Sequence, residues 1–325
     1  MSAFEFFAAM SQKCFSRSLL AALCFCGSGL HLFGQAPAPE DWTAPSIAKS
    51  NLKPQQPILA ERDDRDEFIR ELVQVEWRAG DPIYLFILLP KLAAKPPVIV
   101  YLYNYATETQ QFLNDDFCKL LTKDGFAAVG FAPALSGQRY HDRPMREWFV
   151  SELQEALGET AHDVQMVLNY LAARDDLDMT RVGLFGDGSG GAVAVLSAAA
   201  DRRARAIDLL DAWGDWPDWL AKSSVVPDEE RTTFLTPAFL SKVAPLDPVR
   251  WLPSLTIPMR MQYIRGDGAT PARAIDRMQT AAPKQTLLIP RDRALSEYRA
   301  TSGTKFLDWL KNCLRKAPAA QQSTE

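Results

Sequence analysis

A glycine-rich turn between two apolar segments is the part of the sequence best suited to chemistry. The first segment, residues 182–185, has the composition of a strand, and the second, 192–200, that of a helix. When a strand runs directly into a helix through small residues, the sharp turn lifts one side chain above the sheet edge, where it can attack a carbonyl group. The sequence therefore predicts a nucleophile elbow, made of Gly186, Asp187, Gly188, Ser189, Gly190 and Gly191.

The segments around this turn resemble those of the α/β-hydrolases. Residues 168–174 are similar to the helix before the elbow strand of that family, and 178–181 to the turn into it. The resemblance covers about residues 70–315 as a fold pattern and is to secreted esterases and dienelactone-hydrolase-like enzymes. It implies a carboxylic ester hydrolase with a serine nucleophile, a histidine base and an acid, acting on a small-molecule ester or ligand.

The register of the elbow departs from the family pattern, Gly-x-nucleophile-x-Gly. Gly186 and Gly190 take the two glycine positions, so Gly188, which has no side chain, stands at the nucleophile position. Ser189 becomes the nucleophile only if the turn shifts by one residue and places Asp187 at the first glycine position. Otherwise Ser189 caps the helix that follows, a role that serine fills well. The spacing favours the inert elbow.

The base of the family also has no counterpart at its expected place. The resemblance puts a histidine in the loop after the last strand, but residues 290–296 contain none. After the first 36 residues the only histidines are His141 and His162. His141 follows the predicted strand 126–131 and is expected on the same rim as the elbow, because ligands bind outside the carboxyl ends of the strands. It is either a relocated base or an exposed loop residue; His162 falls in the first turn of a predicted helix and is expected to be structural.

Several carboxylates are candidates for the acid. Asp267 lies in the loop after the predicted strand 259–264, where the resemblance places the acid, although it also suits a turn. Asp211 and Asp215 follow the preceding strand and are alternatives.

The oxyanion hole is expected from the residues that follow the predicted strand 98–103. The family has His-Gly there, whereas this chain has Asn104 and Tyr105. Main-chain N–H groups supply many oxyanion holes, so Tyr105, Ser189 and the Asn104 side chain are the candidate donors. With nucleophile and base both changed, binding and these donors would leave at most about a thousandfold rate advantage over water.

Three hypotheses for function follow. The first is an exported α/β-hydrolase-fold protein with impaired or absent catalysis that keeps a ligand pocket. The second is an active ester hydrolase that uses Ser189, and the third is a noncatalytic partner-binding protein. The pocket would be walled by aromatic residues and Asn104, unless the aromatic residues fill the core of an inserted cap. These wall candidates are Tyr103, Asn104, Tyr105, Trp213, Trp216 and Trp219.

The hydrophobic pattern predicts an α/β fold with a mostly parallel, doubly wound sheet, an N-terminal antiparallel hairpin and a small inserted cap. Strands are expected at 70–77, 83–89, 98–103, 126–131, 181–185, 206–210, 259–264 and 286–289. Helices are expected at 112–123, 145–174 with a break near Gly158, 192–200, 271–281 and 298–314. Residues 213–251, rich in Trp and Pro, are expected to be irregular and to form the cap or a rim loop.

The ends of the chain predict export. Lys13 and Arg17 precede an apolar run, 19–25, and the small residues Gly34 and Ala36 suit cleavage. Residues 1–36 are therefore expected to be a signal peptide, with an uncleaved helical membrane anchor as the alternative. Periplasmic or extracellular location follows, with no integral membrane span after cleavage. A Pro-rich linker or arm is expected at 37–60, the hydrolase-like domain at 61–317 and a disordered tail at 318–325.

Composition limits the partners. The 325 residues carry a formal net charge of −4 without clustered Lys and Arg, which argues against nucleic-acid binding. No cofactor motif is present, and the few histidines and cysteines predict no metal site. Cys118 and Cys313 remain after signal cleavage, either as one bridge or, the preferred interpretation, as two buried free thiols.

Overall fold

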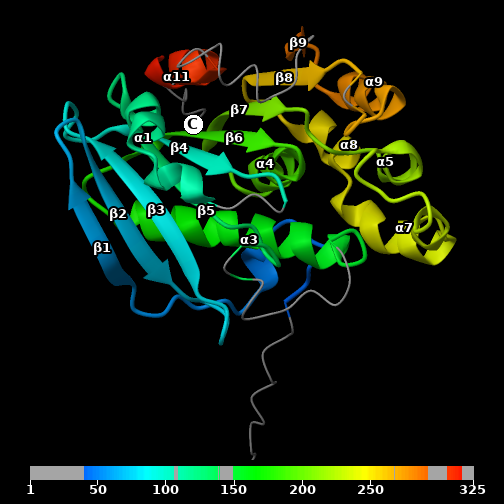
Figure 1. The fold of residues 1–325 in the computed structure, drawn as a ribbon, viewed down its shortest axis with the longest axis horizontal. Helices are drawn as coiled ribbons and strands as arrows, with labels where there is room; N and C mark the ends of the chain where they lie inside the picture. The colour runs from blue at the N-terminus through cyan, green and yellow to red at the C-terminus, as the bar shows by residue number, and fades with distance from the viewer. Residues whose placement is uncertain are drawn as a thin grey trace, which may run out of the picture. The chain divides into compact units, whose positions relative to one another are not determined.

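The structure, a computed structural model, describes residues 40–105, 109–137, 139, 149–266, 268–291 and 306–316. All of them belong to the unit Ala38–Glu325. One nine-stranded sheet forms its centre, in the order β1-β2-β3-β5-β4-β6-β7-β8-β9 (Figure 1). Its strands are β1 (Ile58–Asp64), β2 (Phe68–Val75), β3 (Ile83–Pro90), β4 (Pro97–Leu102), β5 (Ala127–Phe131), β6 (Asp178–Asp187), β7 (Ala204–Leu210), β8 (Met259–Ile264) and β9 (Leu287–Arg291).

The directions of the strands confirm the predicted fold class. β1, β2, β3 and β5 pair antiparallel, and β5, β4, β6, β7, β8 and β9 pair parallel. The strands at the centre of the sheet, such as β4 and β5, are buried along their whole length, as apolar runs covered on both faces should be. The chain order reverses between β4 and β6, because β5 lies on one side of β4 and all later strands on the other. Such a switch point is where open α/β sheets bind ligands.

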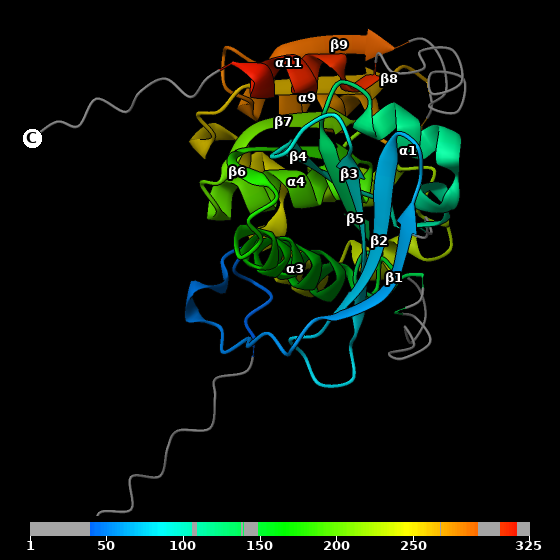
Figure 2. The same cartoon turned by 90° about the vertical axis from the view of Figure 1, so that its left-hand side faces the viewer.

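Helices cover both faces of the sheet (Figure 2). α3 (Leu153–Ala172) and α4 (Ser189–Ala200) pack on one face, whereas α1 (Asp115–Thr122) and α11 (Asp308–Arg315) pack on the other. α9 (Ala272–Ala281) joins the core on the α3–α4 side through Met278. Among the described residues, no helix combines the length and the apolar character needed to cross a bilayer.

The segment before the first strand lies against α3. It contains the short helix η1 (Ile47–Lys49). The Gln165 amide donates to the Pro45 carbonyl oxygen at 2.7 Å, and both ring nitrogens of His162 meet this segment. β1 follows at Ile58, a strand that the sequence analysis did not predict.

The predicted helix break at Gly158 is wrong. α3 runs without interruption through Gly158, which is glycine for a different reason. A Cβ at this position would collide with the backbone of Trp42, so the missing side chain lets the N-terminal segment approach α3. The predicted helix 112–123 is also divided, into η2 (Thr109–Leu113) and α1, because the Asn114 side chain accepts the Phe117 N–H at 3.0 Å and begins a new helix there.

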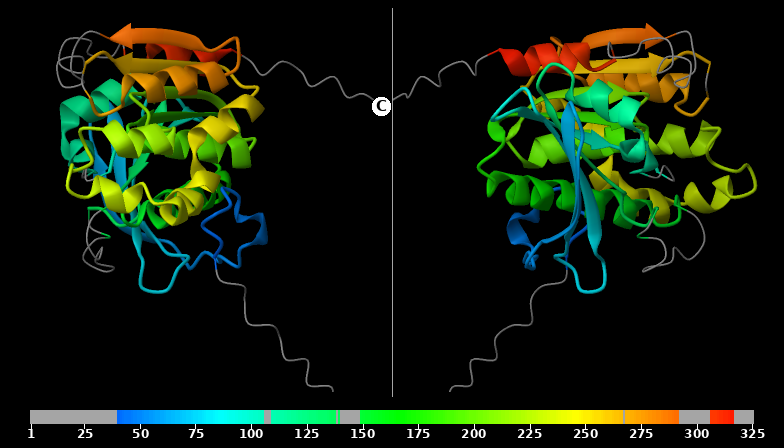
Figure 3. Two further views of the ribbon diagram at one scale, coloured as in Figure 1. Left: turned by 90° about the vertical axis from the view of Figure 1, so that its right-hand side faces the viewer. Right: turned by 60° about the vertical axis from the view of Figure 1, so that its left-hand side comes forward.

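The insert 213–251 is helical rather than irregular (Figure 3). Several of its prolines stand at the first turn of a short helix, where the missing N–H costs no hydrogen bond. Thr236 and Asp247 cap two of these helices with their side-chain oxygens. The elements from the insert to β8 are α5 (Trp216–Lys222), α6 (Arg231–Phe234), α7 (Pro237–Val243), η3 (Ala244–Leu246), α8 (Pro248–Trp251) and η4 (Leu252–Ser254).

Candidate functional site

The predicted elbow lies at the carboxyl end of β6, beside the switch point. Gly188 joins β6 to α4 with φ 55° and ψ −117°, a backbone conformation that residues other than glycine adopt only with strain. The structure thus places Gly188, and not Ser189, at the tip of the turn. Gly188, rather than Ser189, is also the residue that precedes the first turn of α4.

The neighbouring glycines permit close backbone approach. A Cβ at Gly186 would collide with the Gly190 carbonyl group, and one at Gly190 with the Leu102 carbonyl group at the end of β4. A Cβ at Gly191 would strike Ala212, which follows β7. The small residues seen in the sequence therefore let β4, β7 and the start of α4 meet at one point.

Asn104 fills the space that a nucleophile would need. A Cβ built on Gly188 would lie 2.5 Å from both Cγ and Oδ1 of Asn104 and 2.7 Å from its Nδ2. Real Cβ atoms do not approach other heavy atoms this closely. The side-chain amide of Asn104 consequently occupies the position where a serine or cysteine at residue 188 would project.

The predicted oxyanion donors are brought together, but they bond to one another. The Ser189 N–H donates to Asn104 Oδ1 at 3.0 Å, and the Ser189 hydroxyl donates to the same oxygen at 3.1 Å. The Tyr105 N–H donates to Ser189 Oγ at 2.7 Å. Asn104, expected to be a donor, therefore acts as an acceptor and stands where the oxyanion of a substrate would be bound.

Aromatic rings close over this cluster. The Tyr105 ring stacks on Phe149 with 3.8 Å between centroids, and Phe149 meets the edge of Trp213. Trp213 packs on Trp219 with centroids 4.5 Å apart. The three cap tryptophans and Tyr103 are buried in the hydrophobic core, so these members of the predicted pocket wall fill the core instead.

Comparisons with known proteins agree with this architecture. No family model matches the sequence, and no curated protein matches it. Among solved structures, an acetyl xylan esterase from a Thermoanaerobacterium species superposes with a TM-score of 0.64 at 15% identity, covering 84% of this chain and 95% of that one. The fold is that of the α/β-hydrolases.

Two further structures show the same similarity. An acetyl xylan esterase from a Paenibacillus species has a TM-score of 0.63 at 14% identity, over 81% of this chain and 90% of its own. An S-formylglutathione hydrolase from Agrobacterium tumefaciens has a TM-score of 0.57 at 12% identity, over 79% and 99%. The α/β-hydrolase resemblance seen in the sequence is thus confirmed at the level of fold.

The remaining candidates for the α/β-hydrolase triad are only partly described. His141 and Asp267 lie outside the described residues, as do residues 292–305, which follow β9 in the sequence. Asp211 follows β7 with φ 48°, and its Oδ1 accepts the Ile264 N–H of β8 at 3.3 Å, so its carboxylate is directed toward β8.

Asp215 belongs to the start of the cap. Its N–H and that of Trp216 donate to the Asp247 carboxylate, both at 2.9 Å. Burial and the nearby charge of Asp247 raise the pKa of Asp215, and the Arg277 guanidinium lies 4.0 Å from its Oδ2. Asp215 therefore has a structural position at the α5 terminus.

His162 is held within α3. Its Nδ1 lies 2.5 Å from Glu40 Oε1, and its Nε2 lies 2.7 Å from the Ala44 carbonyl oxygen. Because both ring nitrogens are engaged and the ring is buried, His162 has the structural role that the sequence analysis expected.

A buried ion-pair network, which the sequence analysis did not predict, lies at the loop after β5. Arg139 lies in this loop and binds Asp81 Oδ1 at 2.9 Å, Glu159 Oε1 at 2.8 Å and Asp163 Oδ2 at 2.7 Å. Burial alone would raise the pKa of Asp163, but the charges of Arg78 and Arg139 outweigh it and lower that pKa. The network holds the side chain of Arg139, two residues before His141 in the sequence.

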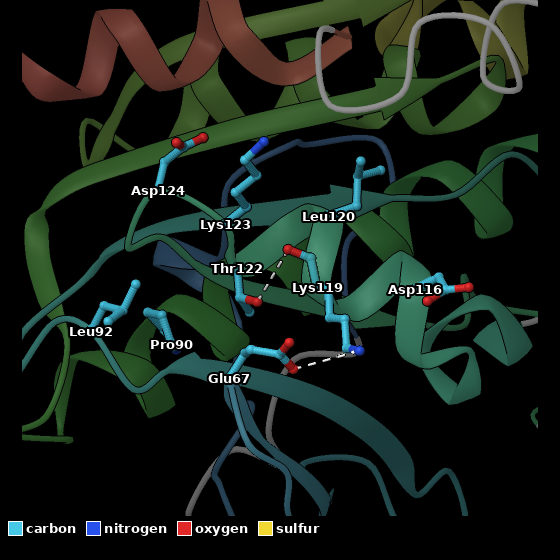
Figure 4. Close-up of a pocket in the computed structure, with 9 residues that line it drawn as sticks. All are labelled: Glu67, Pro90, Leu92, Asp116, Lys119, Leu120, Thr122, Lys123 and Asp124. Atoms are coloured by element: carbon cyan, nitrogen blue, oxygen red, sulfur yellow. Dashed lines mark hydrogen bonds and ion pairs between the residues drawn. The ribbon is translucent and has the colours of Figure 1, made fainter.

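A hollow of about 390 Å³ lies between α1 and the β2–β3 hairpin, away from the elbow (Figure 4). Its charges are mixed, and Glu67 and Lys119 form an ion pair across it at 3.6 Å. The Thr122 hydroxyl donates to the Cys118 carbonyl oxygen of its own helix at 2.8 Å. Since its charges are of both signs, this hollow indicates no particular ligand. The described residues contain no cluster of ligands that would hold a metal ion.

Proposed function

We propose that this protein is an exported, noncatalytic α/β-hydrolase-fold protein that does not cleave esters at its elbow. The observation that carries the proposal is the Asn104 side chain. It takes the nucleophile space above Gly188, and its Oδ1 accepts the N–H that would bind a substrate oxyanion. An ester carbonyl therefore meets neither an attacking group nor a free Ser189 N–H.

The hydrogen bonds of Ser189 argue against the rival serine-hydrolase function. A serine hydroxyl attacks only when a neighbouring base takes its proton. The Ser189 hydroxyl instead donates to an amide oxygen of Asn104, which is too weak a base for this step. Its lone pair is further engaged by the Tyr105 N–H, and the residue is only 3% exposed. The sequence adds no histidine in the loop after the last strand that could replace Asn104.

Hydrolysis of p-nitrophenyl acetate tests the proposal. The purified chain is compared with Ser189→Ala and with Ser197→Ala. Ser197 is a matched control because it lies on the same helix and its hydroxyl forms no hydrogen bond with any residue that the structure describes. We expect all three proteins to release p-nitrophenol at the rate of buffer. Turnover that Ser189→Ala abolishes and Ser197→Ala keeps would show an active elbow and overturn the proposal.

Export is the second part of the proposal and is supported by the basic, apolar and small residues in succession at the N-terminus. Expression in a Gram-negative bacterium followed by fractionation tests it. We expect the chain in the periplasm with its first 36 or so residues removed, as read by N-terminal sequencing. An uncleaved chain that stays in the cytoplasm would contradict export without affecting the proposal about the elbow.

A further inference from the structure

A second site lies at the opposite end of the sheet from the elbow. A cavity of about 680 Å³ opens at the amino ends of β6, β7, β8 and β9, beside the C-terminal end of α11. About seven residues of β6 separate it from Gly188, roughly 20 Å at the rise of a strand. We infer that this cavity binds a small amphipathic anion, that is, a carboxylate attached to an apolar chain or ring. The inference does not depend on the absence of catalysis at the elbow.

Much of the cavity lining is apolar. Ile257 lies just before β8 and Met259 begins it, Leu287 comes from β9, and Trp309 and Leu314 come from α11. Leu287 is 42% exposed, so apolar surface faces solvent here. Both the size and the mainly apolar lining are those of small-molecule pockets, which range over roughly 300–1,000 Å³.

The charged residues that line the cavity are all cations. Arg181, Arg205 and Lys316 line it, and no carboxylate is among the described residues that do. Arg181 binds Asp178 through its Nε at 2.6 Å, and its two terminal nitrogens form no hydrogen bond with the residues that the structure describes. The Nε of Arg205 donates to the Thr180 carbonyl oxygen at 3.2 Å, and no described carboxylate forms an ion pair with this side chain. Lys316 forms no ion pair with any residue that the structure describes.

This arrangement selects the charge of the ligand. Three cations line the cavity, and one carboxylate, Asp178, is bonded to Arg181. Arg205 lies close to Arg181, because its Nε donates to the carbonyl oxygen of Thr180, the preceding residue. Guanidinium groups bind carboxylates through two parallel hydrogen bonds, which favours a carboxylate over a neutral or positive head group. The hollow of Figure 4 differs in this respect because its cations are matched by acids.

Cys313 offers a direct reporter, because it lines the cavity and is half-buried. Burial raises the pKa of its thiol, so alkylation is best followed at mildly alkaline pH. The experiment measures the rate at which N-ethylmaleimide modifies the peptide that carries Cys313 in the full chain. Decanoate is added below its micelle concentration, and decyltrimethylammonium serves as the ligand of equal chain length and opposite charge.

We expect decanoate at ten times its Kd to slow the alkylation of Cys313 about tenfold, since only the unbound protein reacts. The cationic amphiphile should give no protection. The variant Arg181→Gln/Arg205→Gln/Lys316→Gln should lose the protection, whereas Lys53→Gln/Lys95→Gln/Lys242→Gln, which removes three charges elsewhere, should keep it. Arg205→Gln alone covers the case in which the triple variant does not fold, because Arg205 is exposed and makes a single hydrogen bond with the described part of the chain.

Three results would overturn the inference. Equal protection by both amphiphiles would show an apolar groove without charge selection. Unchanged protection in the folded charge variants would place decanoate elsewhere. A Cys313 that does not react in the absence of ligand would show that another part of the chain covers the cavity.

Discussion

Replacing Gly188 by serine should destabilise the protein through two contributions, the strain of the backbone and the collision with Asn104. A side chain in this positive-φ conformation costs about 1–3 kcal/mol. Forcing it against the Asn104 amide, 2.5 Å from the new Cβ, adds about 1–3 kcal/mol of overpacking. We therefore expect Gly188→Ser to lower the free energy of unfolding by about 2–6 kcal/mol, measured by urea denaturation with an unchanged m-value.

A double-mutant cycle separates the two contributions. In an Asn104→Ala background the collision is removed, so Gly188→Ser should cost only the strain, and the two substitutions should couple by about 1–3 kcal/mol. Gly80→Ser is the control for backbone strain, because Gly80 has φ 75° and a Cβ there would meet nothing within 4 Å. If Gly188→Ser costs the same with and without Asn104, the amide does not fill the nucleophile space and the reasoning is refuted.

Three further predictions concern parts of the protein outside the elbow. Gly158→Ala should lower the free energy of unfolding by about 1–3 kcal/mol despite the better helix propensity of alanine, because the new Cβ meets Trp42. Thermal melting tests this with Ala161→Gly as the control on the same helix, and a stabilised Gly158→Ala variant would contradict it. Burial alone would raise the pKa of Glu40, but hydrogen bonds from Arg78 and His162 outweigh this effect, so the pKa is lowered overall. The free energy of unfolding should therefore fall as the pH drops below about 4 and Glu40 becomes protonated. Urea midpoints of Glu40→Gln should depend less on pH in that range, and an identical pH profile would argue against the ion pair. Burial raises the pKa of Cys118 to about 11, so its peptide should stay unmodified by N-ethylmaleimide in the native chain while that of Cys313 reacts.

Much of the fold was predictable because the central strands are buried on both faces. The apolar runs 98–103 and 126–131 differ from β4 and β5 by a single residue at their ends. The insert was misjudged because its Trp- and Pro-rich composition suggests irregular structure, whereas Pro237 and Pro248 stand at first helical turns. β1 was missed because its residues are almost all exposed, so it lacks the apolar alternation that marks a half-buried strand.

The elbow could be predicted from the sequence, but the position of the Asn104 side chain beside it could not. The spacing of Gly186 and Gly190 is local information, and it placed Gly188 at the tip of the turn. The contact that closes the site joins residues 85 positions apart in the chain. Whether Asn104 donates to a substrate or accepts from Ser189 depends on the direction of its side chain, which only the packing of β4 beside β6 decides. The free state of Cys118 and Cys313 agrees with the preferred interpretation, although Cys313 is half-buried rather than buried.

Covalent labelling with an alkyl fluorophosphonate tests the absence of an elbow nucleophile most directly. This reagent forms a stable ester with an activated serine, and intact-mass measurement followed by peptide mapping locates it. We predict that the native chain gains no mass under conditions that label an active esterase completely. An adduct on Ser189 that disappears on unfolding would contradict the account, because it would show an activated hydroxyl where the structure has one bonded to Asn104.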